Sequence, residues 1–204
     1  MDTADRILLT ELCEKLSSGS WDEAEIATAA KEIELAIDHP DTYVSEHPDA
    51  AWIVEECQTG WIASAFSPEE AQLEYQRLVK EWAILGIFLS VGVYGDKADE
   101  IVEQVIDLFE DLELELPPLP VAKHGYEWYE PFLNAAIAEI QPEKGGFRLI
   151  YLSQSFDESL YLVAVYRPDV DRIIEISNRF EFKISTSCWG NSIGDHLHLP
   201  TEED

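Results

Sequence analysis

The chain has 204 residues, and its 46% apolar and 11% aromatic content excludes intrinsically disordered and low-complexity proteins. A chain of this length can bury a full hydrophobic core without a metal or a disulfide framework. Its 42 acidic and 13 basic residues give a formal net charge of −29. This charge argues against direct binding to nucleic-acid phosphates or to an anionic membrane.

The start of the chain is predicted to form two helices. Residues 5–17 place apolar side chains at helical spacing, and Gly19 follows where that helix should end. Ser20 and Glu23 have the spacing of a capping box, so a second helix is expected to begin there. Pro40 ends this second helix, because the residue before a proline avoids helical geometry.

The next segment is expected to mix loop, helix and strand. The acidic residues 40–46 are predicted to be a loop, and residues 48–57 a short helix that begins at a proline. Gly60 then separates this helix from residues 61–66, a short strand candidate.

The clearest local signal in the chain is the start of a long helix. Ser67 has the position of an N-cap, Pro68 that of the first helical residue and Glu70 that of the capping-box acid. Gly86 is expected to end this helix. Residues 87–94 are apolar and β-branched, which predicts a buried strand, although a helix is the alternative.

A second amphipathic helix and a connector are predicted next. Asp96 is expected to cap a helix over about residues 97–111, whose apolar and acidic side chains fall on opposite faces. The prolines in residues 112–121 cannot continue a helix and favour an extended connector. This is the best candidate boundary in the chain.

The remainder is predicted to hold one helix followed by a ββαβ unit. The helix lies around residues 126–140. Strands at Phe147–Leu152 and Leu160–Tyr166 form a hairpin, because a polar loop separates two β-rich runs. A helix over residues 167–178 and a strand over residues 180–184 complete the unit.

Together these elements predict an α+β protein: a mixed β-sheet with a C-terminal ββαβ unit, packed by helices and preceded by an N-terminal helical layer. We expect a single domain over residues 1–204. A subdivision is allowed at the connector 112–121, between a mainly helical acidic part, 1–111, and the ββαβ part, 122–204.

Catalytic and cofactor motifs are missing from the sequence. It has no glycine-rich phosphate loop, nucleophile elbow, HExxH pair or EF-hand pattern, so no catalytic residue and no cofactor are predicted. Cys13, Cys57 and Cys188 are odd in number and widely spaced, unlike a disulfide framework. The first residues do not resemble a signal peptide, and the apolar stretch 82–94 is too short for a membrane span. A cytoplasmic location is expected.

The C-terminal tail offers an alternative, an enzyme or small-ligand protein with a metal site. Asp195, His196 and His198 lie close together in the sequence, and Cys188 precedes them. Two imidazoles two residues apart on a strand point to the same face, which suits zinc. Such loose spacing is common, however, and a tail near the chain end offers little to orient the ligands.

An aromatic segment follows the connector. Tyr126, Trp128 and Tyr129 lie within four residues of one another. If exposed, they would anchor a protein partner, because Trp and Tyr dominate interface energetics. If Trp128 and Phe132 instead point inward, the segment is ordinary core at i, i+4 spacing.

The acidic composition favours a role in protein–protein interaction. Residues 1–120 hold 28 acids and 6 bases, a net charge of −22. We expect a non-catalytic protein whose acidic helices dock onto a basic protein partner, as in immunity proteins against nuclease toxins and in DNA-mimic inhibitors. A scaffold or subunit whose acidity only keeps it in solution is the other alternative. The candidate partner-binding acids are Glu69, Glu70, Glu74, Asp99, Glu100, Glu103, Asp107 and Glu110.

Overall fold

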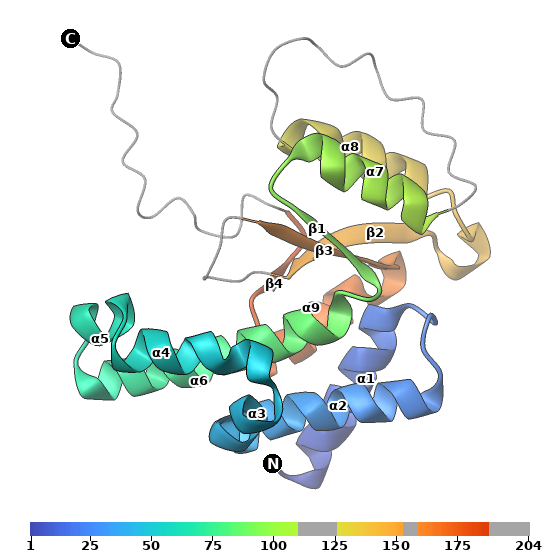
Figure 1. Cartoon of the computed structure of the whole chain (residues 1–204). Coiled ribbons are helices and arrows are strands. Elements are labelled where there is room, and N and C mark those ends of the chain that lie inside the picture. Colours follow the sequence, from blue (N-terminus) through green and yellow to red (C-terminus); the bar gives the residue numbers. More distant parts are fainter. Residues whose placement is uncertain (110–125, 153–158, 188–204) are drawn as a thin grey trace, which may run out of the picture.

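A four-stranded sheet lies at the centre of the computed structural model, which describes residues 1–109, 126–152 and 159–187 (Figure 1). The strand order is β1-β3-β2-β4. Each pairing among these strands is antiparallel. The strands are β1 (Gly92–Gly95), β2 (Phe147–Leu152), β3 (Leu160–Tyr166) and β4 (Ile184–Ser185).

Helices account for most of the remaining described residues. The α-helices are α1 (Thr3–Ser17), α2 (Glu23–Asp38), α3 (Pro40–Glu46), α4 (Ala51–Gln58), α5 (Trp61–Ala65), α6 (Pro68–Phe88), α7 (Ala98–Leu108), α8 (Tyr126–Ile137) and α9 (Val170–Arg179). Short 3-10 helices are η1 (Pro48–Ala50), η2 (Pro142–Lys144) and η3 (Arg167–Asp169).

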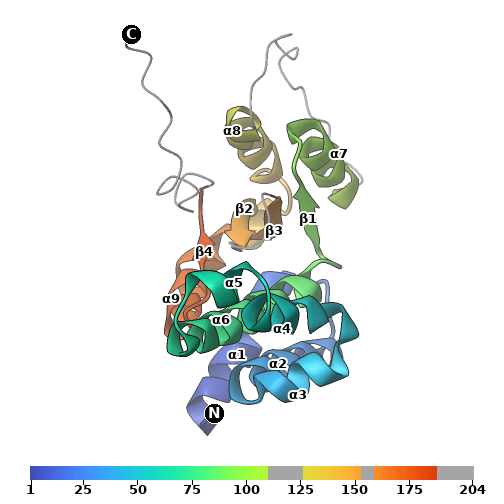
Figure 2. The same ribbon diagram turned by 60° about the vertical axis from the view of Figure 1, so that its left-hand side comes forward.

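Different helices cover the two faces of the sheet. The side chains of β2 alternate: Leu149 and Tyr151 belong to the cluster formed with α7 and α8, whereas Ile150 and Leu152 belong to the cluster on the opposite face. On that opposite face lie α1, α2, α9 and the end of α6 (Figures 1 and 2). The sheet is therefore buried on both sides, with α7 and α8 as one outer layer.

A helical arm extends from the sheet layers (Figure 1, left). We use this name for α3, η1, α4, α5 and the first part of α6. These elements surround a hydrophobic cluster of their own, which includes Ile53, Ile62 and Val79. Since α6 contributes Val79 to this cluster and Phe88 to the one under the sheet, a single long helix connects the arm to the rest of the fold.

The α+β class and the C-terminal ββαβ unit are confirmed, the latter as β2, β3, α9 and β4. The capping box of α6 is also confirmed, because Ser67 Oγ accepts from the Glu70 N–H and Glu70 Oε2 accepts from the Ser67 N–H. The sheet is antiparallel and not mixed, since β4 returns beside β2 and not beside β3. The predicted connector 112–121 lies outside the described residues.

Two predicted strands are wrong or displaced. Residues 61–65 of the predicted strand 61–66 form the short helix α5, which buries Ile62 in the arm and pairs with none of the described strands. Over residues 87–94, α6 continues past Gly86 to Phe88, and only the end of the segment is strand β1. Gly86 is exposed and is tolerated within the helix, while Phe88 is buried against Trp21 at a ring separation of 4.9 Å.

Three helix starts also differ from the sequence prediction. Residues 40–46 are not a loop but α3, which begins at a proline and buries Tyr43. The second helix is capped by Asp22, whose carboxylate accepts from the Glu25 N–H at 2.9 Å, and not by Ser20. The N-cap of α7 is Lys97 instead of Asp96 and makes no side-chain cap bond.

The last predicted strand, over residues 180–184, is shorter than expected. Glu181 has a φ of 62°, a left-handed conformation that interrupts an extended chain. Strand β4 therefore begins only at Ile184, although Phe182 before it is buried as the alternating pattern predicted.

Candidate functional site

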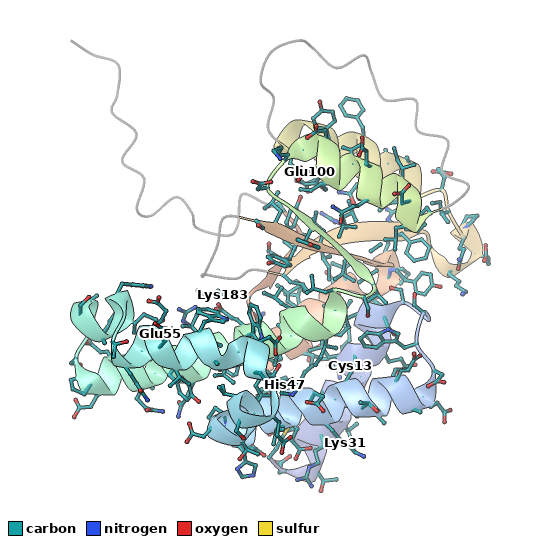
Figure 3. The ribbon with its side chains drawn as sticks, in the orientation of Figure 1. Cys13, Lys31, His47, Glu55, Glu100 and Lys183 are labelled. Carbon is teal, nitrogen blue, oxygen red and sulfur yellow. The ribbon has the colours of Figure 1, made fainter. Side chains whose placement is uncertain are left out.

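The candidate acidic residues occupy two separate parts of the molecule. Glu69, Glu70 and Glu74 lie at the start of α6, in the helical arm. Asp99, Glu100, Glu103 and Asp107 lie on α7, on the far side of the sheet. Figure 3 shows this separation through its labels, with Glu100 on α7 far from Glu55 on α4 of the arm. The acids therefore do not form one continuous face. Glu110 lies outside the described residues.

Three of the acids on α7 form a row, which we call the α7 stripe: Asp99, Glu103 and Asp107. They are spaced at i, i+4 and i+8, so neighbouring carboxylates stand about 6 Å apart along the helix axis. All three are exposed, and none forms an ion pair with any residue that the structure describes. Glu100 differs, because its carboxylate contacts Lys97 Nζ at 2.7 Å.

The α7 stripe stands on a firmly held helix. On the opposite side of α7, Ile101 and Val105 are fully buried against the sheet layer. Gln104 Nε2 donates to the backbone carbonyl of Tyr94 at 2.8 Å, and the Tyr94 N–H donates to Gln104 Oε1 at 3.2 Å. The Gln104 side-chain amide therefore satisfies both the backbone N–H and the backbone carbonyl of Tyr94 on the edge strand β1, and it fixes α7 to that strand.

The acids at the start of α6 are engaged within their own helix. Glu70 closes the capping box, and the Ser67 N–H bound to its carboxylate holds the pKa of Glu70 below its ordinary value. Glu74 forms an ion pair with Arg77. Arg77 also contacts the buried carboxylate of Glu81 at 2.6 Å. Glu69 and Glu70 are exposed and in none of the described ion pairs, but Glu70 is engaged by the capping box. This group therefore explains helix stability better than binding.

Basic residues are used mainly to hold helices together. Arg172 on α9 binds Glu11 on α1 through two contacts of 2.8 and 2.7 Å, and this guanidinium lowers the pKa of Glu11. Lys15 reaches Asp169 at 2.6 Å across the same helix pair. The Lys and Arg side chains found in ion pairs within the described ranges are Arg6, Lys15, Arg77, Lys80, Lys97, Arg172 and Arg179.

The aromatic anchors predicted after the connector are not on the surface. Tyr126 and Tyr129 are only 4% and 6% exposed and pack in the cluster between α8 and the sheet. The prediction that these two residues are exposed anchors is therefore wrong, because α8 turns their rings toward β2. The side chain of Trp128 lies outside the described part. The sequence reading missed Trp61, which is 57% exposed, because it assigned that residue to a strand.

The described cysteines have the character of inert thiols. Burial raises the pKa of Cys13 to about 12. Burial, and then the carboxylates of Glu74 and Glu56, raise the pKa of Cys57. Both thiols therefore stay protonated at neutral pH and are poor nucleophiles.

The described ranges contain neither a metal-binding cluster nor a helix suited to a membrane. No cluster of three or more His, Cys, Asp or Glu side chains there is arranged to hold a metal ion. No helix in those ranges has the length and apolar character to cross a bilayer. The metal-binding alternative falls outside the described residues, since it rests on Cys188, Asp195, His196 and His198.

Comparisons of the chain with models of protein families, with curated proteins and with solved structures found no match. The α7 stripe is therefore interpreted from its own geometry and charge.

Proposed function

We propose that this protein is a non-catalytic binding protein whose α7 stripe docks onto a basic protein partner. One observation carries the proposal: Asp99, Glu103 and Asp107 form a row of exposed carboxylates without an ion pair in the described structure, on a helix whose other face is fully buried.

The charges of the stripe repel one another when the protein is alone. Two unit charges about 6 Å apart in water repel by about 0.7 kcal/mol, and Glu103 has such a neighbour on each side. A partner that presents Lys or Arg side chains at matching spacing replaces this repulsion with attraction. Electrostatic complementarity of this kind raises the association rate and suppresses wrong partners.

The firm attachment of α7 favours binding as well. The two hydrogen bonds between Gln104 and Tyr94, together with buried Ile101 and Val105, fix the helix before a partner arrives. A surface that is already ordered loses less conformational entropy on association. Leu108, 39% exposed on the last turn of α7, offers an apolar contact next to Asp107.

The test compares two variants with equal net charge in affinity capture from native lysate. The first neutralises the α7 stripe by Asp99→Asn, Glu103→Gln and Asp107→Asn. The matched control neutralises three exposed acids elsewhere: Glu14→Gln, Glu46→Gln and Glu139→Gln. The captured protein is identified, purified, and its affinity for each variant is measured at low and at high salt.

We expect a basic partner that binds the control like the wild type and the stripe variant roughly tenfold more weakly, since each lost charge pair is worth up to about 1 kcal/mol. Binding should weaken steeply as salt rises. Equal binding by the two variants would show that α7 is not the interface. The absence of any specific basic partner would leave the acidity as a solubility feature and reject the proposal.

A further inference from the structure

The helical arm contains a pocket of about 260 Å³ between α3, α4 and α6. Its polar lining comes from Asp41 on α3, from Cys57 and Gln58 on α4, and from Gln72 and Tyr75 on α6. These residues are distant in the sequence and meet only because α3 packs against α6. The pocket lies apart from the α7 stripe.

Asp41 is the charged residue of the pocket lining. Burial first, and then the neighbouring Asp41 carboxylate, raise the pKa of the Tyr75 hydroxyl, which also lines the pocket. Asp41 has no ion pair with any base in the part of the chain that the structure describes. Its carboxylate thus lies beside a neutral hydroxyl, with no described cation paired to it.

The surroundings strengthen the negative potential. The carboxylates of Glu56 and Glu74 both act to raise the pKa of the Cys57 thiol at the pocket wall. Arg77 is the opposing charge there, but it is already engaged by Glu74 and by the buried Glu81. The Cys57 thiol stays protonated and neutral beside these carboxylates. The pocket lining includes no Lys, Arg or His side chain.

The remaining lining is apolar and suits a short hydrocarbon chain. Val54, Pro68 and Ala71 provide this part of the wall. A volume of about 260 Å³ equals that of about nine waters and lies just below the usual range for drug-sized ligands. The pocket therefore matches a single side-chain-sized group better than a nucleotide or a cofactor.

We propose that this pocket binds a guanidinium group carried on a short alkyl chain. The Asp41 carboxylate would accept charge-assisted hydrogen bonds from the planar donors, and the amide oxygens of Gln58 and Gln72 can accept the others. The alkyl chain would lie along Val54, Pro68 and Ala71. The group can belong to a free small molecule or to an arginine of a protein. Binding of a guanidinium from either source does not depend on the α7 stripe, so this proposal goes beyond the proposed function.

The test uses n-butylguanidinium as the probe and n-butylurea as its uncharged isostere. Binding to the full-length protein is followed by amide chemical shifts, including the side-chain amides of Gln58 and Gln72. Butylguanidinium should saturate a single site with shifts confined to the arm, and butylurea should bind at least tenfold more weakly. Equal binding of the two probes, or binding of neither, overturns the proposal.

Two variants of α3 locate the site. Asp41→Asn removes the proposed carboxylate and should weaken butylguanidinium roughly tenfold. Glu46→Gln removes an equal charge from the same helix outside the pocket lining and should leave the affinity unchanged. If Asp41→Asn does not fold, Tyr75→Phe is used instead, since it removes the pocket hydroxyl next to Asp41 and should weaken the probe severalfold. If butylguanidinium binds Asp41→Asn, or its substitute Tyr75→Phe, with the same affinity as Glu46→Gln, the assignment of the site to this pocket is refuted.

A last comparison distinguishes the two sources of guanidinium. A short peptide with one arginine between glycines should bind more tightly than butylguanidinium if the site receives a protein side chain, and more weakly if it serves a small molecule. The α7-neutralised variant should bind butylguanidinium like the wild type. If it does so while failing to capture a basic partner, the stripe and the pocket are shown to act separately.

Discussion

Replacing Glu103 with lysine tests whether the α7 stripe serves binding at a cost to folding. Glu103 lies one helical turn from Asp99 and one turn from Asp107. Like charges at i, i+4 destabilise a helix by about 0.2–0.5 kcal/mol per pair, and opposite charges stabilise it by a similar amount. Glu103→Lys converts two repulsive pairs into two attractive ones. The expected gain in unfolding free energy is therefore about 0.8–2 kcal/mol.

Urea and thermal unfolding at low salt measure this gain. A gain of about 1 kcal/mol should raise the melting temperature by about 2–4 °C for a protein of this size. Glu103→Gln serves as the control, because it removes the repulsion without adding attraction and should give about half the effect. Near 1 M salt the difference between variants should shrink, since exposed charges are screened over about 3 Å. Binding to a basic partner should weaken in the same variant.

The outcome that would refute this reasoning is a loss of stability in Glu103→Lys at low salt, because the stripe would then support the fold. A gain that persists unchanged in high salt would also refute it, since the effect would not be electrostatic. A more stable variant that still binds the partner as tightly as the wild type would remove the binding role of the stripe.

Three further outcomes follow from other contacts. Gln104→Ala should lower the unfolding free energy by about 1–2 kcal/mol and speed hydrogen exchange at Tyr94, because two hydrogen bonds are lost. Arg172 lowers the pKa of Glu11 in the folded protein. The pair therefore stabilises the fold fully above pH 4.5, the ordinary carboxyl pKa, and this stabilisation is lost as the pH falls through the lower pKa of the folded state. In Glu11→Gln, the free energy of unfolding measured with urea should therefore fall less steeply below about pH 4.5 than in the wild type. Cys13 should resist thiol reagents in the native protein and react only on unfolding, as burial raises its pKa to about 12.

The parts of the fold that depend on local sequence could be predicted. Strands β2 and β3 match the predicted ranges, because each is a β-rich run bounded by turn or loop residues. The start of α6 follows from the Ser67 and Glu70 capping box, whose two bonds lie within four residues. The acidic face of α7 was also predictable, because the opposite face carries buried apolar residues at helical spacing.

The parts that depend on tertiary packing could not be predicted in this way. Helices α3 and α5 are too short for a periodic pattern, and each is stabilised by one or two side chains, such as Tyr43 and Ile62, that become buried only in the assembled arm. The inward orientation of Tyr126 and Tyr129 likewise depends on how α8 packs on the sheet. The pocket beside Asp41 joins three helices, so no stretch of sequence indicates it.

The charged side chains of this protein fall into two groups, those in ion pairs and those outside them. Ion pairs such as Arg172–Glu11 and Lys15–Asp169 place scarce cations between α1 and the α9 region, where they hold packed elements together. Other cations are paired elsewhere, as Arg77 is within α6. Asp99, Glu103 and Asp107 are exposed acids outside the described ion pairs, and one helix aligns them. Acidity needed for solubility alone would not require such alignment. Under the proposed function, changes to the ion pairs should alter stability more than binding, and changes to the α7 stripe should alter binding more than stability.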